Sequence, residues 1–116
     1  MLGQLRAHKL QTGTACLCAT MTQAVPNDKE IDDIHTQLLS MLKTPHVLIF
    51  DMRNAVVYQY LPFIPRLIDI VNSAEANAVI RAEIWLAQGF SLLLPFVQSI
   101  IDDKVRGIKM IVRAVS

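Results

Sequence analysis

The sequence predicts an α/β fold: one domain with a mixed, mostly parallel sheet and three helices, in the order β-β-α-β-α-β-α-β. The length of 116 residues suits one domain with one core, so residues 1–116 are treated as a single domain. Two short, largely apolar runs, HVLIFDM (46–52) and AEIWLA (82–87), are typical of inner strands. Segments with helical periodicity alternate with these runs, which favours right-handed crossovers between parallel strands.

The first third of the chain predicts a hairpin followed by a helix. Leu5–Leu10 and Thr14–Thr22 have strand character, and the TGT around Gly13 signals a turn between them. Asn27 is a good N-cap, and Glu30 three residues later completes a capping box. Apolar residues then recur at helical spacing, namely Ile31, Ile34, Leu38 and Met41/Leu42.

The middle of the chain predicts a central strand and a second helix. Pro45 ends the first helix, and the apolar run 46–52 indicates a strand that is covered on both faces. The segment NAVVYQY (54–60) fits either an extension of that strand or a loop. Pro62 is expected to begin the second helix, because proline is tolerated in a first turn. The apolar stripe of this helix is Leu61, Ile64, Leu67/Ile68 and Val71.

The last third predicts two further strands around a third helix. The run 82–87 indicates a short buried strand that is parallel to 46–52, with Glu83 at its flank. Gly89 turns the chain, Ser91 can cap, and LLLPFVQSIIDD (92–103) forms the third helix. Its apolar stripe is Leu93, Phe96/Val97 and Ile100/Ile101. Gly107 marks the turn before the final strand within GIKMIVRAV (107–115).

Two stretches nearly repeat each other: LPFIPRLID (61–69) and LPFVQSIID (94–102). Each follows a predicted buried strand and begins a predicted helix. Phe63 and Phe96 are therefore expected to be buried anchors of equivalent helix openings, and truncating either to Ala should cost ~3–5 kcal/mol. The favoured interpretation is two similar solutions to one packing problem. The alternative is a shared apolar site beyond the carboxyl ends of the strands.

The composition predicts that some apolar surface is covered by a partner protein, a second copy or a ligand. Hydrophobic residues make up 53% of the chain and charged residues 18%, which is richer in apolar residues than usual. The net charge is +1 with scattered Lys and Arg, so no basic stripe indicates nucleic-acid binding. The charge-free run 88–101 is too short to span a bilayer. The charged N-terminal segment does not fit an export signal, so a cytoplasmic location is expected.

The chemistry-bearing residues do not predict an enzyme, a metal site or a cofactor. Cys16 and Cys18 form C-x-C without a second pair, which favours two free thiols in a strand. The histidines at positions 8, 35 and 46 show no convergence, and the glycines at 3, 13, 89 and 107 form no phosphate loop. Asp51 and Arg53 end the central strand, where sites often lie. Their favoured role is an ion pair, and an enzyme built on them is a remote alternative.

The order of elements resembles the STAS domain, the fold of anti-sigma-factor antagonists and of the cytoplasmic tails of sulfate transporters. The resemblance is carried by a hairpin, a helix, a buried strand ending in Asp (VLIFDM, 47–52), a helix, a short strand, a helix and a last strand. It covers nearly the whole chain and is greatest for the STAS-like proteins grouped with the sporulation antagonist SpoIIAA. It implies this fold, a non-catalytic regulatory or binding role, and a tendency to pair.

The sequence departs from the switch type of that family. Those proteins carry a phosphorylatable Ser or Thr in a D-S-S-G-like loop at the start of the helix after the strand. The corresponding stretch here, MRNAVVYQYLPFIP (52–65), contains no Ser, Thr or Gly. The kinase-controlled switch is therefore not carried over, and no segment after VRAVS corresponds to the family's final helix.

Two functions remain open at the level of sequence. The first is a regulatory or interaction module that docks to a protein partner or to itself as a homodimer. The second is a carrier or sensor that holds a small apolar ligand between the helices and the 56–63 loop. Loops on a rigid sheet often carry binding residues, and tyrosine offers a large contact area at low entropic cost. The expected partner- or ligand-contact residues are Val56, Val57, Tyr58, Tyr60, Phe63, Phe90 and Phe96. Phe90 is preferred to Trp85, because a large apolar residue in a turn needs cover.

Overall fold

The computed structural model confirms the predicted α/β fold and element order. It describes the backbone of residues 3–21 and 26–116, so Thr22 at the predicted end of the second strand lies outside the described residues. Five strands form one sheet in chain order: β1 (Gly3–Lys9), β2 (Ala15–Met21), β3 (His46–Met52), β4 (Val79–Ala87) and β5 (Met110–Val115). β1 is antiparallel to β2, and β2 to β5 are mutually parallel. β3 and β4 are inner strands, as predicted.

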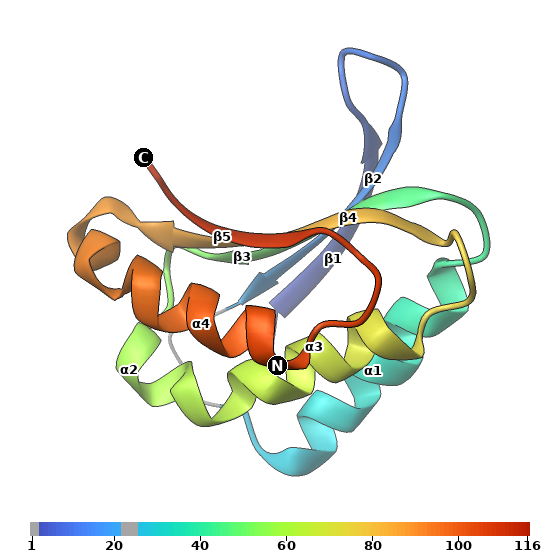
Figure 1. Cartoon of the computed structure of the whole chain (residues 1–116). Coiled ribbons are helices and arrows are strands. Elements are labelled where there is room, and N and C mark those ends of the chain that lie inside the picture. The colour runs from blue at the N-terminus through green and yellow to red at the C-terminus, as the bar shows by residue number, and fades with distance from the viewer. Residues whose placement is uncertain (1–2, 22–25) are drawn as a thin grey trace.

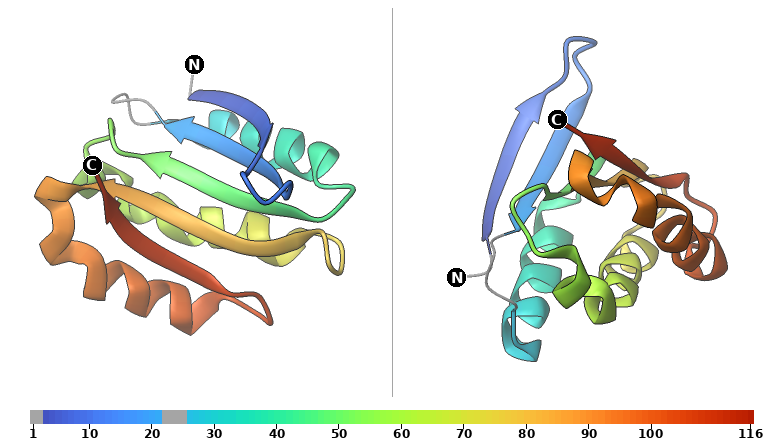
Figure 2. Two further views of the ribbon diagram at one scale, coloured as in Figure 1. Left: turned by 90° about the horizontal axis from the view of Figure 1, so that it is seen from above. Right: turned by 90° about the vertical axis from the view of Figure 1, so that its left-hand side faces the viewer.

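Three principal helices connect the parallel strands: α1 (Asp28–Met41), α3 (Ile64–Ser73) and α4 (Leu94–Lys104). Each crossover joins neighbouring strands and advances in the same direction across the sheet. Right-handed crossovers then place every helix on the same face. Figure 1 shows the described helices on one side of the sheet, and the left view of Figure 2 shows the strands uncovered from the other side. We call this second side the open face.

The predicted hairpin turn at Gly13 and the predicted capping box of the first helix are both present. Gly13 adopts a positive φ of 85°, a conformation that suits glycine, and the Leu10 N–H donates to the Thr14 carbonyl at 2.9 Å. The capping box of α1 is complete. The Glu30 N–H donates to Asn27 Oδ1 at 2.8 Å, and the Asn27 N–H donates to Glu30 Oε1 at 3.2 Å.

The main core lies between the sheet and the helices. Alternate residues of β2 to β5 face it because successive strand side chains point to opposite faces. The buried strand residues are Leu17, Ala19, Met21, Leu48, Phe50, Met52, Val79, Ala82, Ile84, Leu86, Met110 and Val112. The principal helices contribute Ile31, Ile34, Leu38, Ile64, Leu67, Ile68, Ile70, Val71, Val97 and Ile101.

The segment after β3 is helical, which corrects both the prediction of a strand extension or loop at 54–60 and that of a 56–63 loop. A short helix α2 (Val57–Tyr60) leads through the 3₁₀ turn η1 (Leu61–Phe63) into α3. Pro62 therefore lies within helical structure and does not begin it. Because proline cannot donate a backbone hydrogen bond, Pro62 and Pro65 coincide with the tightened turn and with the start of α3.

The two LPF stretches are not equivalent, and Phe96 is not a buried anchor. Residues 61–63 form η1 ahead of α3, whereas residues 94–96 are the first turn of α4 itself, which follows the 3₁₀ segment η2 (Gln88–Leu93). The buried stripe of α4 contains Val97 and Ile101, and at 3.6 residues per turn Phe96 lies off that stripe. Phe96 is 54% exposed, while Phe63 is half-buried against Tyr60, with ring centroids 6.5 Å apart.

The outer edge of β5 is closed by α4, which runs alongside it in the left view of Figure 2. The Val112 N–H donates to Gln98 Oε1 at 2.9 Å, and Gln98 Nε2 donates to the Met110 carbonyl at 3.1 Å. The side-chain amide of Gln98 thus satisfies two of the backbone groups that a sixth strand would otherwise pair. Covering an edge in this way protects a sheet from strand addition.

Candidate functional site

The open face carries a small apolar cluster surrounded by charged side chains. Cys16, Val47 and Ile49 are buried there, and Leu10, Cys18 and Trp85 pack against them. Apart from Leu10, which lies between β1 and β2, these residues alternate along β2 to β4 with residues of the main core. β3 is thus buried on both faces, as its apolar run predicts, although helices cover only one of them in the described part of the chain.

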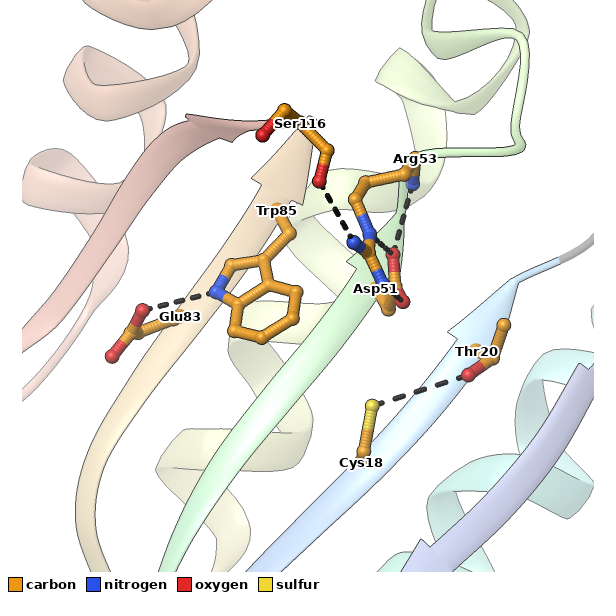
Figure 3. A network of polar contacts seen from close by, with 7 residues as sticks. All are labelled: Cys18, Thr20, Asp51, Arg53, Glu83, Trp85 and Ser116. Atoms are coloured by element: carbon orange, nitrogen blue, oxygen red, sulfur yellow. Dashed lines mark hydrogen bonds and ion pairs between the residues drawn. The ribbon is translucent and has the colours of Figure 1, made fainter. Parts of the chain in front are cut away.

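Asp51 and Arg53 form the ion pair that the sequence favours, at the carboxyl end of β3. Arg53 Nη2 donates to Asp51 Oδ2 at 2.8 Å, and Arg53 Nε donates to Asp51 Oδ1 at 2.9 Å. The guanidinium carbon of Arg53 lies 5.2 Å from the ring centroid of Trp85, and Nη1 donates to the Ser116 carbonyl at 3.2 Å (Figure 3). The hydrogen bonds from Arg53 hold the pKa of Asp51 below its ordinary value, although burial opposes this effect.

Glu83 is a buried mid-strand residue of β4, and its predicted place at the flank of a strand is wrong. Its carboxylate accepts from Trp85 Nε1 at 3.0 Å, from Arg81 Nε at 3.1 Å and from Arg113 Nη1 at 3.3 Å. Burial alone would raise the pKa of Glu83, but the hydrogen bonds from Trp85 and Arg81 and the positive charges outweigh it and hold the pKa below its ordinary value. Trp85 thus links the two carboxylates through its indole N–H and its ring face (Figure 3).

This network is suited to holding the open face together and poorly suited to proton transfer. A carboxylate whose pKa lies below its usual range is a weak general base near neutral pH. Both carboxylates are in that condition, since each is bonded by guanidinium groups. The hydrogen bonds around Asp51 therefore favour an ion pair with Arg53 and do not support a role for Asp51 in proton transfer.

The thiols and histidines of the described residues do not assemble into a metal-binding group. Neither Cys16 nor Cys18 forms a disulfide bond, and burial raises the pKa of the Cys16 thiol, with a further contribution from Cys18. Cys18 Sγ lies 3.9 Å from Thr20 Oγ1. His46 Nδ1 lies 2.6 Å from the Thr44 carbonyl oxygen. Within the described part of the chain, no three His, Cys, Asp or Glu residues gather closely enough to hold a metal ion.

A shallow depression of about 400 Å³ lies at the carboxyl ends of β3, β4 and β5. Its lining combines the polar residues Arg53, Asn54, Gln88 and Ser116 with Ala87 and Val115, and the surface that it exposes is mainly apolar. The location agrees with the rule that ligand sites in open sheets lie beyond the carboxyl ends of strands. The depression does not lie between the helices and residues 56–63, where the sequence places an apolar ligand.

An exposed apolar patch lies beyond the same ends of the strands. Tyr58 is 62% exposed, and its ring packs edge-on against Phe90 with centroids 5.9 Å apart, which joins α2 to η2. Leu92 is 93% exposed and lies four residues before the exposed Phe96. Figure 1 shows α2 and the η2–α4 junction at one end of the molecule. We define the apolar end patch as Val56, Tyr58, Phe90, Leu92 and Phe96.

The predicted contact residues divide into accessible and inaccessible groups. Val56, Tyr58 and Phe96 are exposed and Phe90 is partly exposed, so they are available to a partner. Val57 and Tyr60 are buried in the main core, which corrects their assignment as contact residues. They point inward because residues 57–60 form a helical turn packed on the core, whereas a loop would leave them free.

Leu92 is the member of the patch that sequence reasoning missed. The signal was present in the run of three leucines at 92–94, since a helix cannot direct three consecutive side chains to one face. Leu93 and Leu94 pack partly against the core, and Leu92 is therefore directed outward.

Comparison of the chain with protein-family models, curated proteins and solved structures found no match. None of the helices in the described residues has the length and apolarity that crossing a lipid bilayer requires.

Proposed function

We propose that the chain is a non-catalytic interaction module of STAS-like type that docks to another protein chain through the apolar end patch. The observation that carries the proposal is Leu92, a large aliphatic side chain that is 93% exposed. Tyr58 in α2 and Phe96 in the first turn of α4 are also more than half exposed. Figure 1 shows α2 and the start of α4 at the same end of the molecule. Exposed apolar side chains that gather at one end of a molecule mark interaction surfaces.

The patch is held by a rigid base. Phe90 lies partly buried against the core and packs against Tyr58, while Val57 and Tyr60 anchor α2 from beneath. Aromatic residues on an ordered scaffold lose little conformational freedom on binding, which favours affinity. The high apolar fraction of the chain also favours a partner, because the core does not cover the exposed apolar side chains of the patch.

The alternative of an apolar-ligand carrier has less support. The space between α2 and the rest of the core is filled by Val57 and Tyr60, both buried. The depression at the strand ends is shallow and open, whereas small-molecule sites bury most of the surface of their ligand.

Site-specific photo-crosslinking in cells tests the proposal. A photoreactive side chain replaces Leu92 in one variant and Ile80 in a matched control. Ile80 is 49% exposed and lies at the opposite end of β4, away from the patch. We expect protein adducts at position 92 and few at position 80. Equal yields at the two positions would contradict docking through this patch.

A further inference from the structure

We propose that the chain docked on the apolar end patch is a second copy of the same protein, in a two-fold symmetric and weak dimer. This inference rests on the proposed function, because it names the partner of the same patch. Its evidence is the distribution of charge around the patch, the exposed area and the state of the sheet edge at β5.

The charge distribution is the first argument. The patch is built from two segments, 54–65 and 88–101, and neither contains Asp, Glu, Lys, Arg or His. The tertiary structure brings these two uncharged segments together through the contact between Tyr58 and Phe90. In a two-fold contact the same surface faces itself, so any charge near the axis opposes a like charge. An uncharged surface avoids this repulsion and is therefore compatible with itself.

The exposed area sets the expected strength. If a fully exposed large side chain offers ~200 Å², the four exposed members of the patch present about 500 Å² per copy. Two such surfaces bury about 1,000 Å², which lies in the range of weak or transient complexes. The dimer should therefore exchange with monomer in the micromolar range or above and should not be permanent.

The state of the β5 edge argues against a competing route to self-association. Strand addition needs unpaired backbone groups at a sheet edge. On β5 the Val112 N–H and the Met110 carbonyl are already bonded to Gln98 of α4. The apolar end patch therefore offers a surface for a second copy that this edge does not.

Sedimentation velocity of the purified chain over a wide concentration range provides the test. We expect the wild type to shift from monomer toward dimer as concentration rises. Leu92→Asp should weaken dimerisation at least tenfold, because it places two carboxylates in a desolvated contact. The matched control Ile80→Asp changes an exposed residue outside the patch and should dimerise as the wild type does. A wild type that stays monomeric, or Leu92→Asp dimers of unchanged strength, would overturn the proposal.

A mixing experiment tests the symmetry. In a two-fold contact both patches are needed, so labelled Leu92→Asp should bind wild type more weakly than labelled wild type does. If the patch instead bound a different surface of the second copy, the variant would retain that surface and bind wild type fully. If the wild type is monomeric but still gives protein adducts at position 92 in cells, the partner is not a second copy. The proposal that the patch docks to a protein would then still hold. Equal adducts at positions 92 and 80 would contradict the docking itself.

Discussion

The two faces of the sheet are buried by different means. On the helix side, large aliphatic and aromatic residues such as Phe50 and Ile84 meet a continuous layer of helices. On the open face, three small or medium side chains are covered by Trp85 and by neighbouring residues of the sheet itself. Charged groups complete the cover there, with Asp51 and Glu83 buried and their arginine partners partly exposed.

This difference shows how a sheet with helices on only one side can protect its other side. A Trp ring and the aliphatic stems of Arg side chains cover apolar surface while the guanidinium groups remain hydrated. The helix face therefore draws its stability from packing. The open face adds hydrogen bonds whose strength depends on the state of two carboxylates. The following predictions separate these contributions.

Truncation of an isoleucine on each face should give the largest difference. Ile84→Ala on the helix side should lower the free energy of unfolding by about 4 kcal/mol, because rigid neighbours leave a cavity. Ile49→Ala on the open face should cost about 2 kcal/mol, since Trp85 can settle into the space. Urea denaturation of both variants measures the two values. Equal losses would mean that the open face is packed as tightly as the core.

Loss of the Glu83 carboxylate should have the next largest effect. Glu83→Leu leaves the Trp85 N–H and two guanidinium groups without their acceptor, at a cost of ~1–3 kcal/mol. The value stays below that for a fully buried pair because Arg81 and Arg113 can be rehydrated. Glu83→Gln is the matched control, since it keeps an acceptor for Trp85. If urea denaturation shows that Glu83→Leu is as stable as the wild type, the network does not contribute to the free energy of unfolding.

Acidification should weaken the open face by less than removal of the carboxylate. The pKa values of Asp51 and Glu83 in the folded chain lie below the ordinary values of 3.8 and 4.5. The unfolded chain therefore takes up protons first as the pH falls, so this stability is complete above about pH 5 and declines below it. Urea denaturation at a series of pH values measures the decline. The double variant Asp51→Asn, Glu83→Gln should decline less steeply, and an identical decline would assign the effect to other groups.

Removal of a single exposed arginine should have the smallest effect. Arg113 is exposed, and it contributes to the network through a hydrogen bond of 3.3 Å to Glu83. Arg113→Ala should cost less than about 1 kcal/mol, because exposed ion pairs are screened and Arg81 and Trp85 still bind the carboxylate. Thermal unfolding beside Lys109→Ala, an exposed neighbour, measures the difference. A loss above that of Glu83→Leu would show that Arg113 supports more than this bond.

Local chemistry in the sequence was sufficient for much of the fold. The Asn27 and Glu30 capping box, the turn at Gly13 and the periodicity of Ile31, Ile34 and Leu38 each depend on residues only a few positions apart. Such signals predict structure well because the interactions that produce them join residues that are close in the sequence. The alternation of apolar strands with helices likewise fixed the element order, since crossovers of one hand leave few arrangements.

The candidate sites were less accessible from the sequence because they depend on contacts between distant segments. Tyr58 meets Phe90, and Glu83 meets Arg113, only after the crossovers place their strands and helices side by side. The sequence of residues 54–60 favours a strand extension or a loop, whereas the structure has a helical turn at Val57–Tyr60. Burial of Val57 and Tyr60 in the core stabilises a helical turn that local propensity does not specify.

The sequence by itself determined the fold class, the order of the elements along the chain and the high share of apolar side chains. Composition and periodicity are properties of the chain alone, so they do not depend on how its elements pack. Only the tertiary structure decided which of those side chains remain outside. Leu92 and Phe96 have the same apolar character as the buried Val97, and their exposure follows from the direction in which α4 presents its stripe to the sheet. Burial depends on the placement of every neighbouring element, and that placement is a property of the whole fold.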